Sequence, residues 1–166
     1  MLNHVRMVLI RELALDDWQV MRDIRLAALR EAPYAFGSTY AREALFTEVQ
    51  WRGRISDRAV TYVAYLPDLA EPAGLAGVYL EDDGSAELVS MWVRPAARGR
   101  KAGESLIEAA TGWTRSRGFD TLYLWLTESN AAARHLYERC GFTETGERQP
   151  FPSDPAISEI RMRCPL

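Results

Sequence analysis

The 166-residue chain is long enough to bury a hydrophobic core unaided, and its length predicts a single domain over residues 1–166. It is 48% hydrophobic and 26% charged, as globular proteins usually are, and a net charge of −3 supplies no basic surface for nucleic acid. The apolar run 7–10 is too short for a membrane span or signal peptide, and Cys140 and Cys164 lack metal-ligand spacing, so we expect a reduced, cytoplasmic protein without a metal.

The first half of the chain is predicted to form one strand, two helices and three further strands. Branched apolar residues indicate a strand over 5–13, and apolar residues at helical spacing indicate a helix that Asp16 caps and that ends before Pro33. A second helix is expected over 47–55. The three strands are expected over 59–66, 74–81 and 86–93, and Asp-Asp-Gly between the last two is typical of an antiparallel hairpin.

In the second half, helices alternate with strands. Apolar and small residues from position 102 onward share one face of a helix that is expected to end near Gly118. A strand over 121–127 leads to Asn130, which is suited to cap a helix reaching about Cys140. Gly141 then ends that helix in a left-handed conformation.

The chain is expected to finish with a strand over 157–163, and an additional strand is expected around 142–148. Consecutive strands followed by alternating helices and strands predict an α/β (α+β) fold. We therefore expect a single mixed sheet of six or seven strands, flanked by helices on both faces.

The strand over 86–93 is followed by a segment with the composition of an anion-binding loop. It reads Arg98-Gly99-Arg100-Lys101-Ala102-Gly103 and stands at the start of a predicted helix. The first amide N–H groups of a helix are unpaired and carry partial positive charge, and small residues let a phosphate approach them. The segment therefore predicts a pyrophosphate site, although a solvated basic helix start explains it equally well on its own.

A second motif lies on the helix that follows Asn130. It reads Asn130-x-x-Ala133-x-x-Leu136-Tyr137-x-x-x-Gly141-Phe142. Helical spacing puts Ala133 and Tyr137 on one face, so Tyr137 taken alone is explained by half-buried packing. Together, the loop and this motif resemble the GNAT acetyltransferases over roughly residues 86–142, and the segment 33–38 resembles the acceptor-side loop of many members.

The resemblance implies direct transfer of an acetyl group from acetyl-CoA, the co-substrate, to an amine, without an acyl-enzyme and without a metal. It implies that the main chain of Met91, Trp92 and Val93 binds the pantetheine arm and polarises the acetyl carbonyl. The residues Arg98, Gly99, Arg100, Lys101, Ala102 and Gly103 would hold the pyrophosphate, Asn130 and Ala133 would flank the arm, and Tyr137 would protonate the departing thiolate. Lys101 departs from the family pattern, which has a glycine there, and the loop tolerates it if its φ is negative.

The general base and the acceptor pocket are less strongly marked. Strict alternation along the strand puts Glu87 on the face of Met91, where burial would raise the pKa of its carboxyl and suit it to act as a base. A solvated charge at the strand end is the competing explanation. Tyr34, Phe36 and Glu43 are the candidates for the acceptor pocket, and packing of the first two helices explains the same residues.

The sequence does not specify whether the acceptor is a small-molecule or a protein amine. Three alternatives stay open: an acyl-CoA-binding sensor without catalysis, a transferase of another acyl group, and an acetyltransferase of protein N-termini. A thioester on Cys140 lacks a visible activating base. A homodimer is expected by family analogy only.

Overall fold

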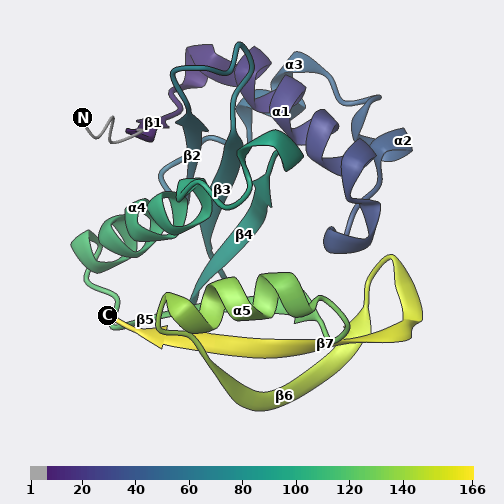
Figure 1. The fold of residues 1–166 in the computed structure, drawn as a ribbon. Helices are drawn as coiled ribbons and strands as arrows, with labels where there is room; N and C mark the ends of the chain where they lie inside the picture. The colour runs from purple at the N-terminus through teal and green to yellow at the C-terminus, as the bar shows by residue number, and fades with distance from the viewer. Residues whose placement is uncertain (1–6) are drawn as a thin grey trace.

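The computed structural model describes residues 7–166, which form one mixed seven-stranded sheet in the order β1-β2-β3-β4-β5-β7-β6 (Figure 1). The strands are β1 Leu9–Glu12, β2 Ala59–Tyr65, β3 Gly74–Leu80, β4 Ala86–Val93, β5 Thr121–Thr127, β6 Thr143–Phe151 and β7 Asp154–Pro165. The helices are α1 Trp18–Glu31, α2 Tyr40–Glu43, α3 Glu48–Arg52, α4 Ala102–Ser116 and α5 Ala131–Arg139, with short 3-10 turns η1 Leu15–Asp17, η2 Pro33–Ala35 and η3 Pro95–Ala97. The predicted mixed sheet is confirmed, while positions 5 and 6 of the predicted first strand lie outside the described residues.

Local sequence signals account for most of the helix ends. The Asn130 side chain accepts a hydrogen bond from the Ala133 amide at the start of α5, and Gly141 has a φ of 97° just beyond its end. The predicted cap at Asp16 is wrong, because the 3-10 turn η1 occupies that position and α1 begins one residue after Asp17. The short helix α2 was not predicted, because four residues are too few to show a helical period.

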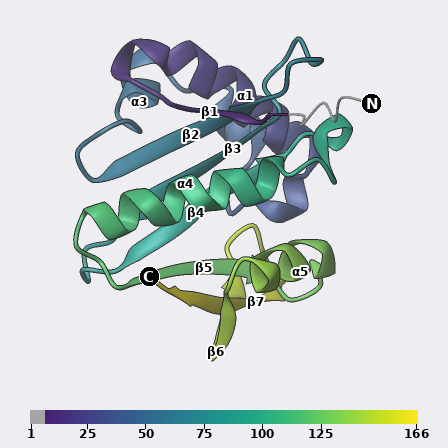
Figure 2. The same cartoon turned by 60° about the vertical axis from the view of Figure 1, so that its left-hand side comes forward.

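Helices cover both faces of the sheet (Figures 1 and 2). Helices α1, α2 and α3 lie on one face, where a core cluster around Trp51, Leu75 and Trp92 is buried. Helices α4 and α5 lie on the other face, over a second cluster that includes Leu106 and Leu124. Within residues 7–166, no helix is long and apolar enough to cross a membrane.

Strand β4 contains a bulge that sets the geometry of the whole site. Leu75 of β3 pairs with Trp92, but Gly77 pairs with Val89, so β4 has one residue more than β3 between these two pairs. The extra residue leaves Ser90 with a φ of 60°, and side chains beyond it point to the opposite face from the one that strict alternation assigns. The parallel strands β4 and β5 pair only through Ala86–Leu122 and Glu87–Tyr123, and beyond these pairs they separate.

Candidate active site

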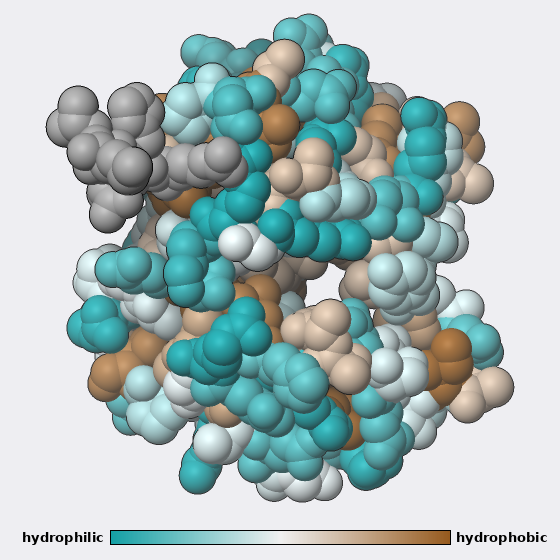
Figure 3. All heavy atoms as spheres, in the orientation of Figure 1, coloured by the Kyte–Doolittle hydropathy of each residue, from teal (hydrophilic) through white to brown (hydrophobic). Residues whose placement is uncertain are grey.

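The separated ends of β4 and β5 enclose two cavities that meet. A groove of about 310 Å³ lies toward the loop before α4, and an inner cavity of about 260 Å³ lies between η2, β4, β5 and β7. The space-filling view shows an opening through the middle of the molecule, above α5 (Figure 3). The residues that line both cavities are Ala35, Met91, Asn130, Ala133 and Tyr137. A ligand that enters by the groove therefore reaches the inner cavity beside Tyr137.

The groove collects nearly all the residues predicted to hold a cofactor. Met91, Trp92, Val93, Arg98, Gly99, Lys101, Ala102, Gly103, Asn130, Ala133 and Tyr137 line it together. Many of its remaining walls are also small, including Ala32, Ala97 and Ala132, so an extended ligand can approach the backbone closely. Helix α4 has no side-chain cap, and its first amides are therefore available to an anion.

The charges of the loop before α4 differ from the prediction. Arg100 does not line the groove and is paired with Asp68, while the Arg98 guanidinium lies 2.9 Å from Glu31 Oε2. Lys101, which has no ion pair within the described residues, has a φ of 71°. The condition under which the loop was expected to tolerate Lys101, a negative φ, is therefore not met: the backbone keeps the left-handed conformation that a glycine would adopt there, at a cost in strain.

Tyr137 lies where the groove and the inner cavity meet. Its side chain is 7% exposed and packs against the Phe142 ring, with ring centroids 5.7 Å apart. No group within residues 7–166 hydrogen-bonds its hydroxyl, which leaves that hydroxyl available to a ligand between β4 and β5. Burial raises the pKa of Tyr137, so the phenol stays neutral at physiological pH.

Glu87 does not share this space with Tyr137. The bulge at Ser90 puts Glu87 on the opposite face from Met91, so the predicted shared face is wrong. Its carboxylate lies 3.3 Å from Arg161 Nη2 in a separate hollow beside Glu81. Burial and the charge of Glu81 raise the pKa of Glu87, as the sequence suggested, although Arg161 opposes the shift.

The three acceptor-side candidates lie in three different places. Phe36 lines the inner cavity, and Tyr34 lines the groove on the cofactor side. Glu43 lines neither and is fully buried, with its carboxylate between the guanidinium groups of Arg25 and Arg54. Its predicted contact with the acceptor is wrong, because the Glu43 carboxylate is buried between these two arginines and does not reach either cavity.

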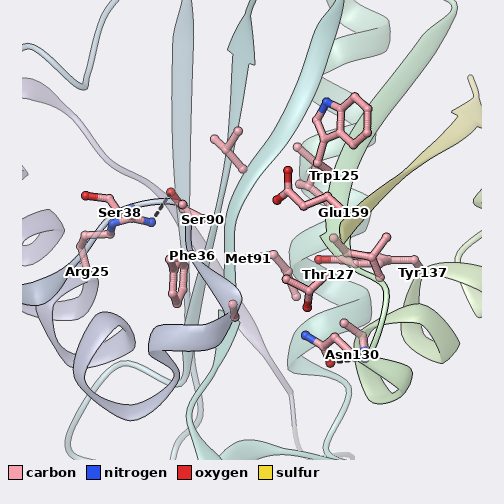
Figure 4. A pocket seen from close by; sticks show the side chains of 16 residues that line it. Arg25, Phe36, Ser38, Ser90, Met91, Trp125, Thr127, Asn130, Tyr137 and Glu159 are labelled. Atoms are coloured by element: carbon pink, nitrogen blue, oxygen red, sulfur yellow. Dashed lines mark hydrogen bonds between the residues drawn. The ribbon is translucent and has the colours of Figure 1, made fainter. Parts of the chain in front are cut away.

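Arg25 is a site residue that sequence reasoning missed. It is 7% exposed on α1, donates to both Glu43 oxygens, and its Nη1 donates to Ser90 Oγ at 3.0 Å. Its guanidinium also lies over the Phe36 ring, 4.7 Å from the centroid. One buried cation thus joins α1 and the η2 loop to the bulged residue of β4, as Figure 4 shows.

Glu159 is the second missed residue. It lies on β7 directly opposite Thr127 of β5, is 7% exposed and lines the inner cavity. Gln149 donates to its Oε2 at 2.7 Å, and burial raises the pKa of its carboxyl against that hydrogen bond. Side chains alternate along a strand, so the buried Ile160 indicates that Glu159 lies on the other face of the sheet, away from α4 and α5. That Glu159 also lies beside the cavity depends on the pairing of β7 with β5, which the sequence does not show.

Cys140 has no place in this arrangement. It lies at the end of α5, lines neither the groove nor the inner cavity, and burial raises the pKa of its thiol. A thiol that lines neither cavity and is hard to ionise is unsuited to carry an acyl group. Within the described residues, no group of three or more His, Cys, Asp or Glu side chains is arranged to hold a metal ion.

Comparison with known proteins agrees with this geometry. The profile of the acetyltransferase (GNAT) family matches residues 18–142. A mycothiol acetyltransferase of Rhodococcus erythropolis is 39% identical over 135 residues, which cover 76% of this chain and 43% of that protein. The chain spans less than half the length of the curated mycothiol acetyltransferases that it matches.

Solved structures share the fold. A GNAT-family acetyltransferase of Streptococcus pneumoniae superimposes with a TM-score of 0.77 at 20% identity, covering 96% of this chain and 99% of that one. Spermidine N-acetyltransferase of Vibrio cholerae, in complex with CoA and spermine, superimposes with a TM-score of 0.73 at 19% identity and 95% coverage of each chain. At these identities the likeness concerns the fold alone.

Proposed function

Because this chain belongs to the GNAT acetyltransferase family, we propose that it transfers the acetyl group of acetyl-CoA to a primary amine. The observation that carries the proposal is the continuous path from the groove beside the α4 N-terminus to the inner cavity at Tyr137. A cofactor with a phosphate end and a thioester end matches such a path. The second cavity supplies a separate approach for the acceptor.

The groove fits CoA by the chemistry of its walls. The start of α4, which lacks a side-chain cap, and the ammonium of Lys101, which forms no ion pair with the described residues, suit the pyrophosphate. Where β4 and β5 separate, β4 leaves backbone groups of Met91 and the N–H of Val93 facing the groove without a strand partner on that side, while the Val93 carbonyl accepts from Arg98 Nε at 3.1 Å. These groups are suited to bind an amide-containing arm as a missing strand would, and to hydrogen-bond the acetyl carbonyl as its charge develops.

The residues around the junction are suited to a direct transfer. The inner cavity holds the amine within reach of the thioester, which makes the attack effectively unimolecular. Tyr137 is held neutral by burial and can donate its hydroxyl proton to the sulfur as the carbon–sulfur bond breaks. Cys140 lines neither cavity, and burial raises the pKa of its thiol, so an acyl-enzyme on Cys140 is not part of the proposal.

Replacement of Tyr137 by phenylalanine tests the proposal. The hydroxyl has no hydrogen-bond partner in the described part of the chain, so Tyr137→Phe is expected to keep the fold and to leave the dissociation constant of acetyl-CoA within about twofold. Turnover, measured as free thiol released with an amine panel, is expected to fall by about 100-fold or more, as when a general acid is lost. Equal loss of affinity and turnover would instead identify Tyr137 as a packing residue.

A further inference from the structure

Glu159 is the only carboxylate among the described residues that line the inner cavity. Figure 4 shows it projecting from β7 into the space between β5 and β4, beside the Trp125 indole and across from Phe36. One of its oxygens accepts from Gln149, and the other has no partner within residues 7–166. That second oxygen is not enclosed by protein and therefore faces the cavity.

The described residues supply no cation that pairs with this carboxylate. Among those that line the cavity, Arg25 is the only other charged residue, and its guanidinium is used by Glu43 and Ser90. Glu159 forms no ion pair within the described chain, and a buried charge without a partner is costly. A neutral amide from Gln149 offsets only part of that cost, so the site is incomplete without a cation.

We propose that Glu159 binds the acceptor as an ammonium ion and accepts the proton that the amine must lose before it attacks. This inference rests on the proposed acetyl transfer. The rings of Trp125 and Phe36 line the cavity and give it apolar walls, although Arg161 and Arg25 already lie over them, 5.7 and 4.7 Å from the respective centroids. A primary ammonium on an apolar stem matches both features.

The same cavity disfavours α-amino acids as acceptors. The carboxylate of an amino acid would lie close to Glu159, and the Arg25 guanidinium, which lines the same cavity, is already paired with Glu43. Like charges that are both withdrawn from water repel strongly. The acceptor class is therefore a cationic primary amine without a carboxylate on the adjacent carbon.

Protons balance in this scheme. The ammonium passes one proton to Glu159, and the neutral nitrogen attacks the thioester carbon, so that a C–N bond forms and the C–S bond breaks. Tyr137 protonates the leaving sulfur and recovers a proton from the nitrogen as the amide forms. Glu159 releases its proton to solvent, and the products are the N-acetylated amine, CoA and one proton.

The test compares Glu159→Gln with Glu147→Gln. Glutamine at position 159 can still accept from Gln149, so E159Q is expected to keep its fold and its affinity for acetyl-CoA. Glu147 is a 56%-exposed carboxylate on the neighbouring strand and serves as the matched control. With n-pentylamine as acceptor, E159Q is expected to lose about 100-fold or more in kcat/KM, and E147Q to stay within about twofold of wild type.

A second arm needs no turnover. In the CoA-bound protein, n-pentylamine is expected to shift the indole NMR signal of Trp125 saturably in wild type and E147Q but not in E159Q. Norleucine, which is pentylamine with an α-carboxylate, is expected to give neither binding nor acetylation. Turnover of n-pentylamine by E159Q at the wild-type rate, no amine-induced shift in wild type, or preference for norleucine would overturn the inference. Failure of wild type to bind acetyl-CoA would instead overturn the proposed function.

Discussion

The buried ion pair between Arg25 and Glu43 is expected to stabilise the fold measurably, and Arg25→Met removes it while keeping most of the side-chain volume. The change deletes two hydrogen bonds to the Glu43 carboxylate, of 3.1 Å from Nε and 2.9 Å from Nη2. Loss of one partner of a buried pair costs about 3–5 kcal/mol. Arg54 still lies 2.8 Å from the Glu43 carboxylate in this variant. We therefore expect a loss at the lower end of that range, about 3 kcal/mol of the free energy of unfolding.

The deficit is expected to depend on pH. Burial alone would raise the pKa of Glu43, but the hydrogen bond and charge of Arg25 and the charge of Arg54 outweigh it and lower that pKa. A carboxyl whose pKa is lower in the folded protein than in the unfolded chain stabilises the fold fully at pH values above the unfolded pKa, near 4.5. This stabilisation is lost as the pH falls from there toward the lower pKa of the folded state. The difference between wild type and R25M should thus be complete at neutral pH and shrink below pH 4.5.

Urea unfolding at several pH values measures both effects. The control is Arg22→Met on the same helix, where an exposed pair with Asp23 is expected to contribute less than about 1 kcal/mol. R25M should also lower kcat/KM more than R22M, because it releases the Ser90 hydroxyl that Arg25 holds at the bulge. The reasoning is refuted if R25M unfolds like R22M, or if its deficit is unchanged at acid pH.

Three further predictions concern the backbone and Tyr137. Lys101→Gly removes the strain of a positive φ, whereas Lys101→Ala loses the same charge but keeps that strain. The glycine variant is therefore expected to have a free energy of unfolding about 1 kcal/mol higher than the alanine variant. Equal stability of the two variants in urea unfolding would contradict this. At Gly74, a Cβ would lie 2.5 Å from the Trp92 carbonyl oxygen, so Gly74→Ala should cost about 1–3 kcal/mol or more, whereas Gly112→Ala, with open space around it, should not destabilise. Because burial raises the pKa of Tyr137, the ratio of wild-type to Y137F kcat should stay constant up to pH 10, and a ratio that falls at lower pH would show an ionising phenol.

The sequence was informative where one local signal decides the structure. Strands β4 and β5 begin and end at the expected residues, because each is an apolar run with turn or cap residues at its ends. The predicted cap at Asn130 follows from its own side-chain oxygen. The groove residues were predicted together because the motifs that carry the family resemblance include the end of β4, the loop before α4 and one face of α5.

What sequence reasoning missed depends on contacts between distant segments. The bulge at Ser90 breaks the alternation on which the assignment of Glu87 rested, and it involves Arg25, which lies 65 residues earlier. Glu43 was expected in the acceptor pocket because the sequence does not reveal its ion pairs. Its partners Arg25 and Arg54 lie too far along the chain for local spacing to show the contact. Glu159 reaches the inner cavity only because β7 pairs with β5 at Thr127. The sequence of a strand does not determine which strand will be its neighbour in the sheet.

Calorimetric titration of the purified protein with acetyl-CoA, with CoA and succinyl-CoA as comparators, tests the central claim most directly. The account predicts saturable binding that favours acetyl-CoA over succinyl-CoA, is weakened by Lys101→Glu beside the start of α4, and is unchanged in Tyr137→Phe. An amine-dependent release of thiol should accompany it. Absence of binding to all three compounds would contradict the account and leave the chain with the fold of an acetyltransferase but not its chemistry.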